Sequence, residues 1–146
     1  VVGIMATPAT FQTDVVASLV ERFAAGVEVL PRGCPGLAGA IEDGTAGLAT
    51  VIPHVEPLVA AGADTIVIGC THYSFVTEFI SAAAGPDITI IDPAPAVARQ
   101  VARVASSGGS AITRFLTTAD PDRFGGQIRR LLAVDTEPER ITTVAS

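Results

Sequence analysis

Apolar residues along this chain fall either into short β-branched runs or into longer stretches with helical spacing. The short runs predict strands at Val1–Met5, Val27–Leu30, Thr65–Gly69, Ile88–Ile91, Arg114–Thr117 and Ile141–Val144. The longer stretches predict helices at Thr10–Ala25, Gly36–Asp43, Leu48–Ala61, Phe75–Ala84, Pro95–Ser106 and Asp120–Leu132. Because strands and helices alternate, the sequence predicts an α/β fold with a mostly parallel sheet.

Prolines and glycines indicate where several of these elements end. Pro31 is expected to end the second strand, and Pro53 and Pro57 predict a kink or a late start in the third helix. Asp120 and Pro121 form a good start for the last helix, as cap and first helical residue. The Ser-Ser-Gly-Gly-Ser run at 106–110 predicts a flexible turn.

The composition adds limits on the class of protein. The 146 residues suit one domain or two small lobes, and 49% hydrophobic content supplies a core. The net charge is −6, and the only basic pair is Arg129-Arg130, so nucleic-acid binding is not expected. No apolar run approaches the roughly 20 residues of a membrane span. With two cysteines and no secretory signal at the start, a reduced, cytoplasmic location is expected.

Polar and reactive residues gather at the predicted strand ends. In parallel α/β sheets, ligands bind outside the carboxyl ends of the strands. The residues at those ends are Thr7 and Thr10, Cys34, Cys70-Thr71-His72, Asp92, and Thr117-Thr118. This clustering predicts a binding or catalytic site at the carboxyl edge of the sheet.

Cys70 is the strongest candidate for chemistry. A thiol between a strand and a helix lies near free backbone N–H groups and the positive end of the helix dipole, which stabilise a thiolate. His72 can act as its proton-transfer partner, and Thr71 offers a hydroxyl and an N–H group to a substrate. The alternative is an inert buried thiol, because free cysteine is among the most buried residue types.

The other candidates have plainer alternatives. Cys34 suits a small buried residue in a turn better than a second reactive thiol. Glu42, near the end of a short helix, is read as a solvated acid, although it could orient His72 or pair with a substrate ammonium. Thr7 and Thr10 could cap a helix or offer their hydroxyls to an anion.

A metal or nucleotide site is not expected. Cys34, His54, Cys70 and His72 could in principle bind zinc, but they show none of the paired spacings of zinc ligands. His54 is interpreted as a surface or packed histidine. Neither a dinucleotide-binding glycine motif nor a phosphate-binding loop occurs.

The residues around Cys70 resemble a known family. Asp64–Tyr73, which reads Asp-Thr-Ile-Val-Ile-Gly-Cys-Thr-His-Tyr, is similar to the second cysteine motif of the glutamate racemases, in the aspartate/glutamate racemase superfamily. The further matches, in order along nearly the whole chain, are Cys34-Pro35, Ile41–Gly44, Glu56–Leu58, Gly62–Thr65, Ile90–Asp92, Ala96–Ala98 and Arg114–Pro121.

The resemblance implies cofactor-independent racemisation of glutamate, which supplies D-glutamate for peptidoglycan. In that family two cysteines face each other across the α-carbon of the substrate, one as base and the other as acid. Cys70 matches the second of them, and His72 the histidine that assists its proton transfer. Thr71 matches a substrate-binding position, and Glu42 an acid near the histidine. Thr7 and Thr10 are expected to contact the substrate.

The chain also departs from the family pattern. Ser74-Phe75-Val76 follows the motif where the family usually has Pro-Leu-Leu, and the turn at Ala6–Thr13 differs from the usual Ser-Gly-Ala-Tyr run. The family region with the first catalytic cysteine and an Asp-Ser motif is not found, and Cys34 matches a different, non-catalytic position.

The resemblance therefore implies a particular domain arrangement. Residues 1–92 would form most of the second α/β domain, and residues 93–146 would return to complete the first, whose N-terminal part is expected to lie upstream. The resemblance also implies a homodimer for the full enzyme. We expect that this chain alone cannot racemise.

Other functions stay open at this level. The substrate could be aspartate or another amino acid of the same superfamily. The chain could also be a non-catalytic, regulatory half-protein that keeps the fold and a ligand pocket. A third alternative is a thiol-dependent hydrolase or redox protein that uses Cys70 alone.

Overall fold

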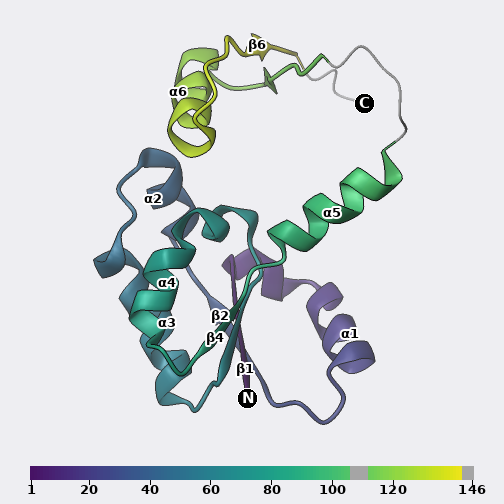
Figure 1. Cartoon of the computed structure of the whole chain (residues 1–146), viewed down its shortest axis with the longest axis vertical. Coiled ribbons are helices and arrows are strands. Elements are labelled where there is room, and N and C mark those ends of the chain that lie inside the picture. Colours follow the sequence, from purple (N-terminus) through teal and green to yellow (C-terminus); the bar gives the residue numbers. More distant parts are fainter. Residues whose placement is uncertain (106–111, 143–146) are drawn as a thin grey trace. The chain divides into compact units, whose positions relative to one another are not determined.

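The computed structural model describes residues 1–105 and 112–142 (Figure 1). The chain divides into two compact units, Val1–Arg103 and Val104–Ser146. The turn predicted at 106–110 and the end of the strand predicted at 141–144 lie outside the described residues.

The first unit is built on a four-stranded parallel sheet. Its strands are β1 (Val2–Ala6), β2 (Val29–Gly33), β3 (Thr65–Ile68) and β4 (Thr89–Ile91), in the order β2-β1-β3-β4. Val2 of β1 lies opposite Val29 on one side and Thr65 on the other. The predicted α/β fold with a parallel sheet is therefore confirmed.

Helices connect these strands. The α-helices are α1 (Asp14–Phe23), α2 (Leu37–Asp43), α3 (Leu48–Ala60), α4 (Thr77–Ala84) and α5 (Ala94–Val104), and the 3₁₀ helices are η1 (Pro8–Gln12) and η2 (Thr71–Val76). Figure 1 shows α3 and α4 on one side of the sheet and α1 on the other. A Cβ on Gly3 would lie 2.8 Å from Leu58 of α3, so a larger residue there would force the Leu58 side chain to shift.

The core lies between the sheet and the α3–α4 pair. Met5 and Ile66 of the sheet are fully buried there together with Val51 and Val55 of α3 and Ile80 of α4. On the opposite face, an apolar hollow of about 580 Å³ separates α1 from the sheet. The apolar stripe of α1 is therefore only partly covered.

The prediction that Pro31 ends the second strand is wrong, and α3 shows no late start at Pro53 or Pro57. Pro31 lies inside β2, which is an edge strand, so its missing N–H group need not interrupt a ladder on both sides. Helix α3 begins at Leu48 and contains Pro53 and Pro57. Pro57 cannot donate to the Pro53 carbonyl, and Arg32 Nη2 donates to that oxygen instead, at 2.6 Å. This contact replaces the lost helical hydrogen bond.

Other element boundaries also differ from the predictions. The helix predicted from Thr10 is the 3₁₀ helix η1 followed by α1. The helix predicted from Phe75 starts only at Thr77, after η2. Thr77 Oγ1 donates to the Ser74 carbonyl (3.0 Å), which marks the junction between η2 and α4. Local periodicity does not distinguish these short 3₁₀ turns from the α-helices that they precede.

The second unit contains a short parallel pair and one helix. The pair is β5 (Leu116–Thr117) with β6 (Glu139–Arg140), and the helix is α6 (Pro121–Leu132). The predicted cap is confirmed, because Asp120 Oδ1 accepts from the Arg123 N–H at 2.8 Å. The sequence predicted a last strand at Ile141–Val144. The structure has β6 two residues earlier, at Glu139–Arg140.

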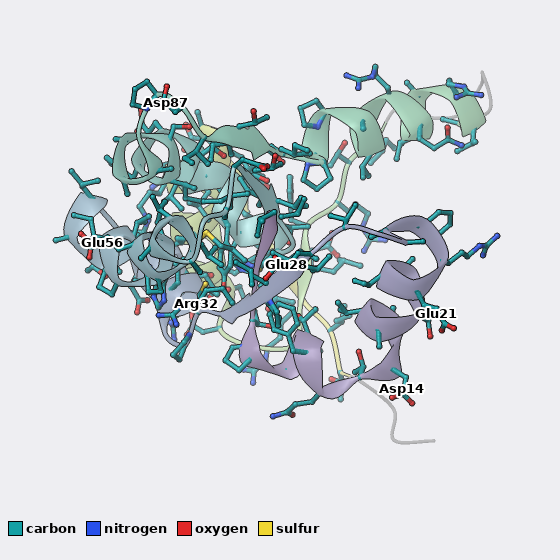
Figure 2. All side chains as sticks on the ribbon, turned by 90° about the horizontal axis from the view of Figure 1, so that it is seen from below. Asp14, Glu21, Glu28, Arg32, Glu56 and Asp87 are labelled. Atoms are coloured by element: carbon teal, nitrogen blue, oxygen red, sulfur yellow. The ribbon has the colours of Figure 1, made fainter. Side chains whose placement is uncertain are left out.

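Charge is confined to the surface of the described chain. Within residues 1–105 and 112–142, no charged side chain belongs to the buried core. Figure 2 shows Asp14, Glu21 and Asp87 projecting outward from the ribbon. None of the helices in these ranges has the length and apolar character needed to cross a membrane.

Candidate active site

Three neighbouring strands bring candidate residues to one edge of the sheet. The Cys34 N–H donates to the Ala6 carbonyl (2.9 Å), and the Gly69 N–H donates to the Met5 carbonyl (2.8 Å). The ends of β1, β2 and β3 are thereby aligned, so Thr7, Cys34 and Cys70 follow adjacent strands. Thr117 and Thr118, which the sequence grouped with them, lie in the second unit.

Cys70 is a free, half-buried thiol immediately after β3. Its backbone is extended (φ −137°, ψ 131°), and it precedes the six-residue 3₁₀ helix η2 rather than an α-helix. Cys70 therefore lies between a strand and a helix, as predicted, but the helix that begins after it is a 3₁₀ helix.

Cys70 contacts His72, and His72 in turn contacts Glu42. Cys70 Sγ lies 3.7 Å from His72 Nδ1, and His72 Nε2 lies 2.8 Å from Glu42 Oε1. Both the imidazole and the carboxylate are partly exposed. Glu42 reaches His72 because α2 packs against η2. Glu42 is thus a partly solvated acid that also makes the contact with His72 that the sequence offered as an alternative.

This arrangement determines which imidazole nitrogen can act as a base. A carboxylate only accepts hydrogen bonds, so His72 Nε2 carries the hydrogen in its contact with Glu42. His72 Nδ1 then presents a lone pair toward the Cys70 thiol. The histidine can take the thiol proton and return it, and the carboxylate stabilises the resulting imidazolium.

Cys34 has a different environment from Cys70. It is 1% exposed, and its Sγ donates to the Arg32 carbonyl at 3.4 Å. Burial raises the pKa of the Cys34 thiol to about 11, although the nearby Arg32 charge opposes this shift. The prediction of a small buried residue in a turn is confirmed.

Tyr73 joins the strand that precedes Cys34 to the segment that follows Cys70. Its side chain is fully buried, and its hydroxyl donates to the Cys34 carbonyl at 3.3 Å. Burial, with smaller effects of Cys34 and Cys70, raises the pKa of Tyr73. Tyr73 therefore stays protonated as a donor and holds η2 against the end of β2.

A pocket of about 370 Å³ opens beside Cys70. Its walls include Cys70, Thr71 and Ser74 on one side and Ala94, Val97 and Ala98 of α5 on the other. Thr71 thus lies where a substrate could contact it. Ser74 and α5 were not among the predicted site residues, because their place at the pocket depends on where α5 lies relative to η2.

Thr7 and Thr10 are less directly connected to Cys70. Their hydroxyl oxygens lie 2.8 Å apart and hydrogen-bond to each other, and the Thr10 N–H donates to the Thr7 carbonyl (3.0 Å). Thr10 lines the hollow beneath α1 and not the pocket beside Cys70. Thr7 remains at the same sheet edge as Cys70.

His54 lies apart from this group, half-buried on α3. Burial, aided by the Arg32 charge, lowers the pKa of His54, so it is neutral at pH 7. In the described ranges 1–105 and 112–142, no three His, Cys, Asp or Glu side chains are grouped so that they could hold a metal ion. The contacts of His72 with Cys70 and Glu42 are suited to proton transfer between the thiol and the imidazole.

Residues 1–101 match the family described as Asp/Glu/Hydantoin racemase. This chain belongs to that family. Among its relatives, the glutamate racemase of Roseiflexus sp. (strain RS-1) is 41% identical over 99% of the chain and 58% of its own length. The glutamate racemase of Herpetosiphon aurantiacus is 40% identical over 92% of the chain and 57% of its own length. The chain thus spans little more than half the length of these relatives.

Solved structures agree with the fold. A glutamate racemase isoform from Bacillus anthracis superposes with a TM-score of 0.81 at 23% identity, covering 97% of this chain and 57% of that one. Escherichia coli glutamate racemase, solved with L-glutamate and the activator UDP-MurNAc-ala, also gives 0.81 at 21% identity, covering 99% and 59%. The resemblance to racemases is confirmed for the family and the fold.

Proposed function

We propose that this chain is the part of a glutamate racemase that supplies one of two opposed acid/base thiols. The observation that carries the proposal is the Cys70–His72–Glu42 chain of contacts at the edge of a pocket. Relatives with about 40% identity that are named glutamate racemase support glutamate as the substrate.

The proposed reaction requires an acid and a base on opposite faces of the α-carbon. A Cys70 thiolate takes the α-proton, forming the thiol and leaving the electron pair on the α-carbon. A thiol on the other face then delivers its proton to that carbon, and the configuration is inverted. In the reverse direction Cys70 is the acid. His72 sets the protonation of Cys70 between turnovers, and Glu42 holds the imidazole in the orientation that this needs.

Thr71, Thr7 and Thr10 have binding roles in this proposal. Thr71 lines the pocket and offers its hydroxyl and N–H to the substrate carboxylate. Thr7 and Thr10 contribute hydroxyls from the neighbouring strand end, where their mutual hydrogen bond orients them. Stabilising the charge that develops on the substrate is a large part of the work in such a reaction, because the α-proton is very weakly acidic.

The proposed enzyme is larger than this chain. Residues 1–92 form most of one α/β domain, and residues 93–146 return to a second domain whose other part supplies the opposing thiol. The full enzyme is proposed to act as a homodimer in the cytoplasm, without a cofactor, and to supply D-glutamate for peptidoglycan. The incomplete coverage of the relatives supports the requirement for a further part.

A fusion protein tests this function. The part of the Roseiflexus glutamate racemase that this chain does not match is joined to the chain, and both the fusion and the chain alone are incubated with L-glutamate in deuterated water. We expect the fusion to form D-glutamate with deuterium at the α-carbon, and the chain alone to form none. Racemisation by the chain alone, or by a folded fusion only with another amino acid, would contradict the proposal.

Glu42→Gln in the fusion separates charge from orientation. The Gln oxygen still accepts from His72 Nε2, so the imidazole keeps its position, but the negative charge is lost. Because charge-assisted hydrogen bonds are stronger by roughly 1–1.5 kcal/mol, we expect kcat to fall about tenfold with little change in KM. The measurement is the pH profile of kcat for both proteins.

The matched control for this experiment is Asp43→Asn, which removes the same charge one position along α2. It is expected to leave kcat within twofold of the unaltered fusion. Equal losses for the two variants would mean that the charge of this helix end matters and not the contact with His72.

A further inference from the structure

Asp92 forms a junction between the segment after Cys70 and the start of α5. A single oxygen, Asp92 Oδ1, accepts from Ser74 Oγ at 2.8 Å and from the Ala94 N–H at 2.9 Å. Ser74 lies in η2, four residues after Cys70, and Ala94 is the first residue of α5. The carboxylate thus accepts from the first N–H of α5 and links this helix to η2 at the same time.

The start of α5 forms one wall of the pocket beside Cys70. Ala94, Val97 and Ala98 face Cys70 and Thr71 across it. Farther along α5, packing holds the helix weakly, since Val97 and Val101 remain 59% and 57% exposed. The hydrogen bonds at Asp92 are therefore the specific contacts that locate this wall.

We propose that Ser74 and Asp92 are a positioning pair that holds the first turn of α5 against the Cys70 pocket and so limits which molecules reach the thiol. That this pocket is the active site of a racemase rests on the proposed function.

Access to Cys70 can be measured on the 146-residue chain itself. At pH 7.5 each protein is treated with iodoacetamide, a small reagent, or with N-(1-pyrenyl)maleimide, a bulky one, and labelling at Cys70 is followed by peptide mass spectrometry. Cys34 is 1% exposed with its pKa raised to about 11, so it stays unlabelled while the protein is folded. The ratio of the two rates at Cys70 reports the size of the opening and not the general reactivity of the thiol.

Ser74→Ala is expected to raise the ratio of bulky to small labelling about fivefold, the factor that corresponds to one lost hydrogen bond. Asp92→Ala should raise it at least as much, because the hydrogen bond to the first N–H of α5 is lost too. Asp92→Asn should have the same ratio as the unaltered chain, since the amide oxygen of asparagine can accept from both donors. The double variant Ser74→Ala/Asp92→Ala should not exceed Asp92→Ala alone.

Ser81→Ala, an exposed serine on α4, is the matched control and should leave the ratio unchanged. Circular dichroism confirms that each variant is folded. An unchanged ratio in folded Ser74→Ala, or an Asp92→Asn ratio as high as that of Asp92→Ala, would overturn the positioning pair. These outcomes are independent of racemisation, so an inactive fusion with the expected labelling ratios would reject only the proposed function.

Discussion

Replacing Cys70 with serine in the fusion protein is expected to lower glutamate racemisation by about 10²- to 10⁴-fold, the range for loss of a general acid or base. A serine hydroxyl is a far weaker acid than a thiol, so it can neither form the base readily nor deliver the proton as easily. The substitution changes one atom at a half-buried position, and the fold should be retained.

The measurement is deuterium incorporation at the α-carbon of glutamate, followed separately from each enantiomer. Cys34→Ser is the matched control, because a serine can keep the contact with the Arg32 carbonyl, and it should remain active. If a folded Cys70→Ser fusion exchanged the α-proton at the unaltered rate from both enantiomers, Cys70 would have no part in the reaction. Equal losses in the two variants would indicate a general effect on folding.

Tyr73→Ala is expected to lower the free energy of unfolding of the chain by about 3–5 kcal/mol, the cost of truncating a large buried aromatic side chain. Tyr73 is the largest of the fully buried side chains in the described chain, and it lies where η2 meets the end of β2. Its removal leaves a cavity and releases the segment that carries His72. Urea unfolding at pH 7 measures the loss.

Tyr73→Phe separates the ring from the hydroxyl. Only the hydrogen bond to the Cys34 carbonyl is lost, so the expected cost is about 1 kcal/mol. A loss as large as that of Tyr73→Ala would mean that the hydroxyl, and not the packing of the ring, holds this junction.

Alkaline pH should weaken the same junction. The pKa values of both Tyr73 and Cys34 are raised in the folded protein, so the unfolded chain loses these protons first. The stability that they contribute is therefore present below pH 9 and declines as the pH rises above that value, where the unfolded thiol and then the phenol ionise. Tyr73→Phe should reduce this decline.

The sequence alone predicted the elements that depend on local pattern. The β-branched runs around Ile66 and Ile90 predicted strands, since period and residue type are properties of a few consecutive residues. It also placed Cys70 at a strand end, and from there at the edge where α/β proteins bind ligands. The family resemblance followed from motifs in the same order along the chain.

The tertiary structure decided which side chains meet at that edge, although the family resemblance had already indicated that Glu42 lies near His72. Glu42 and His72 are 30 residues apart, and Ser74 and Asp92 are 18 apart, so no local period connects them. Their contacts depend on how α2 packs against η2 and on where α5 begins. Likewise, Pro57 stays inside α3 because Arg32 of β2 donates to the Pro53 carbonyl, which the proline leaves without its helical donor. Such contacts arise from packing between distant segments, because each one requires a backbone geometry that the neighbouring residues do not specify.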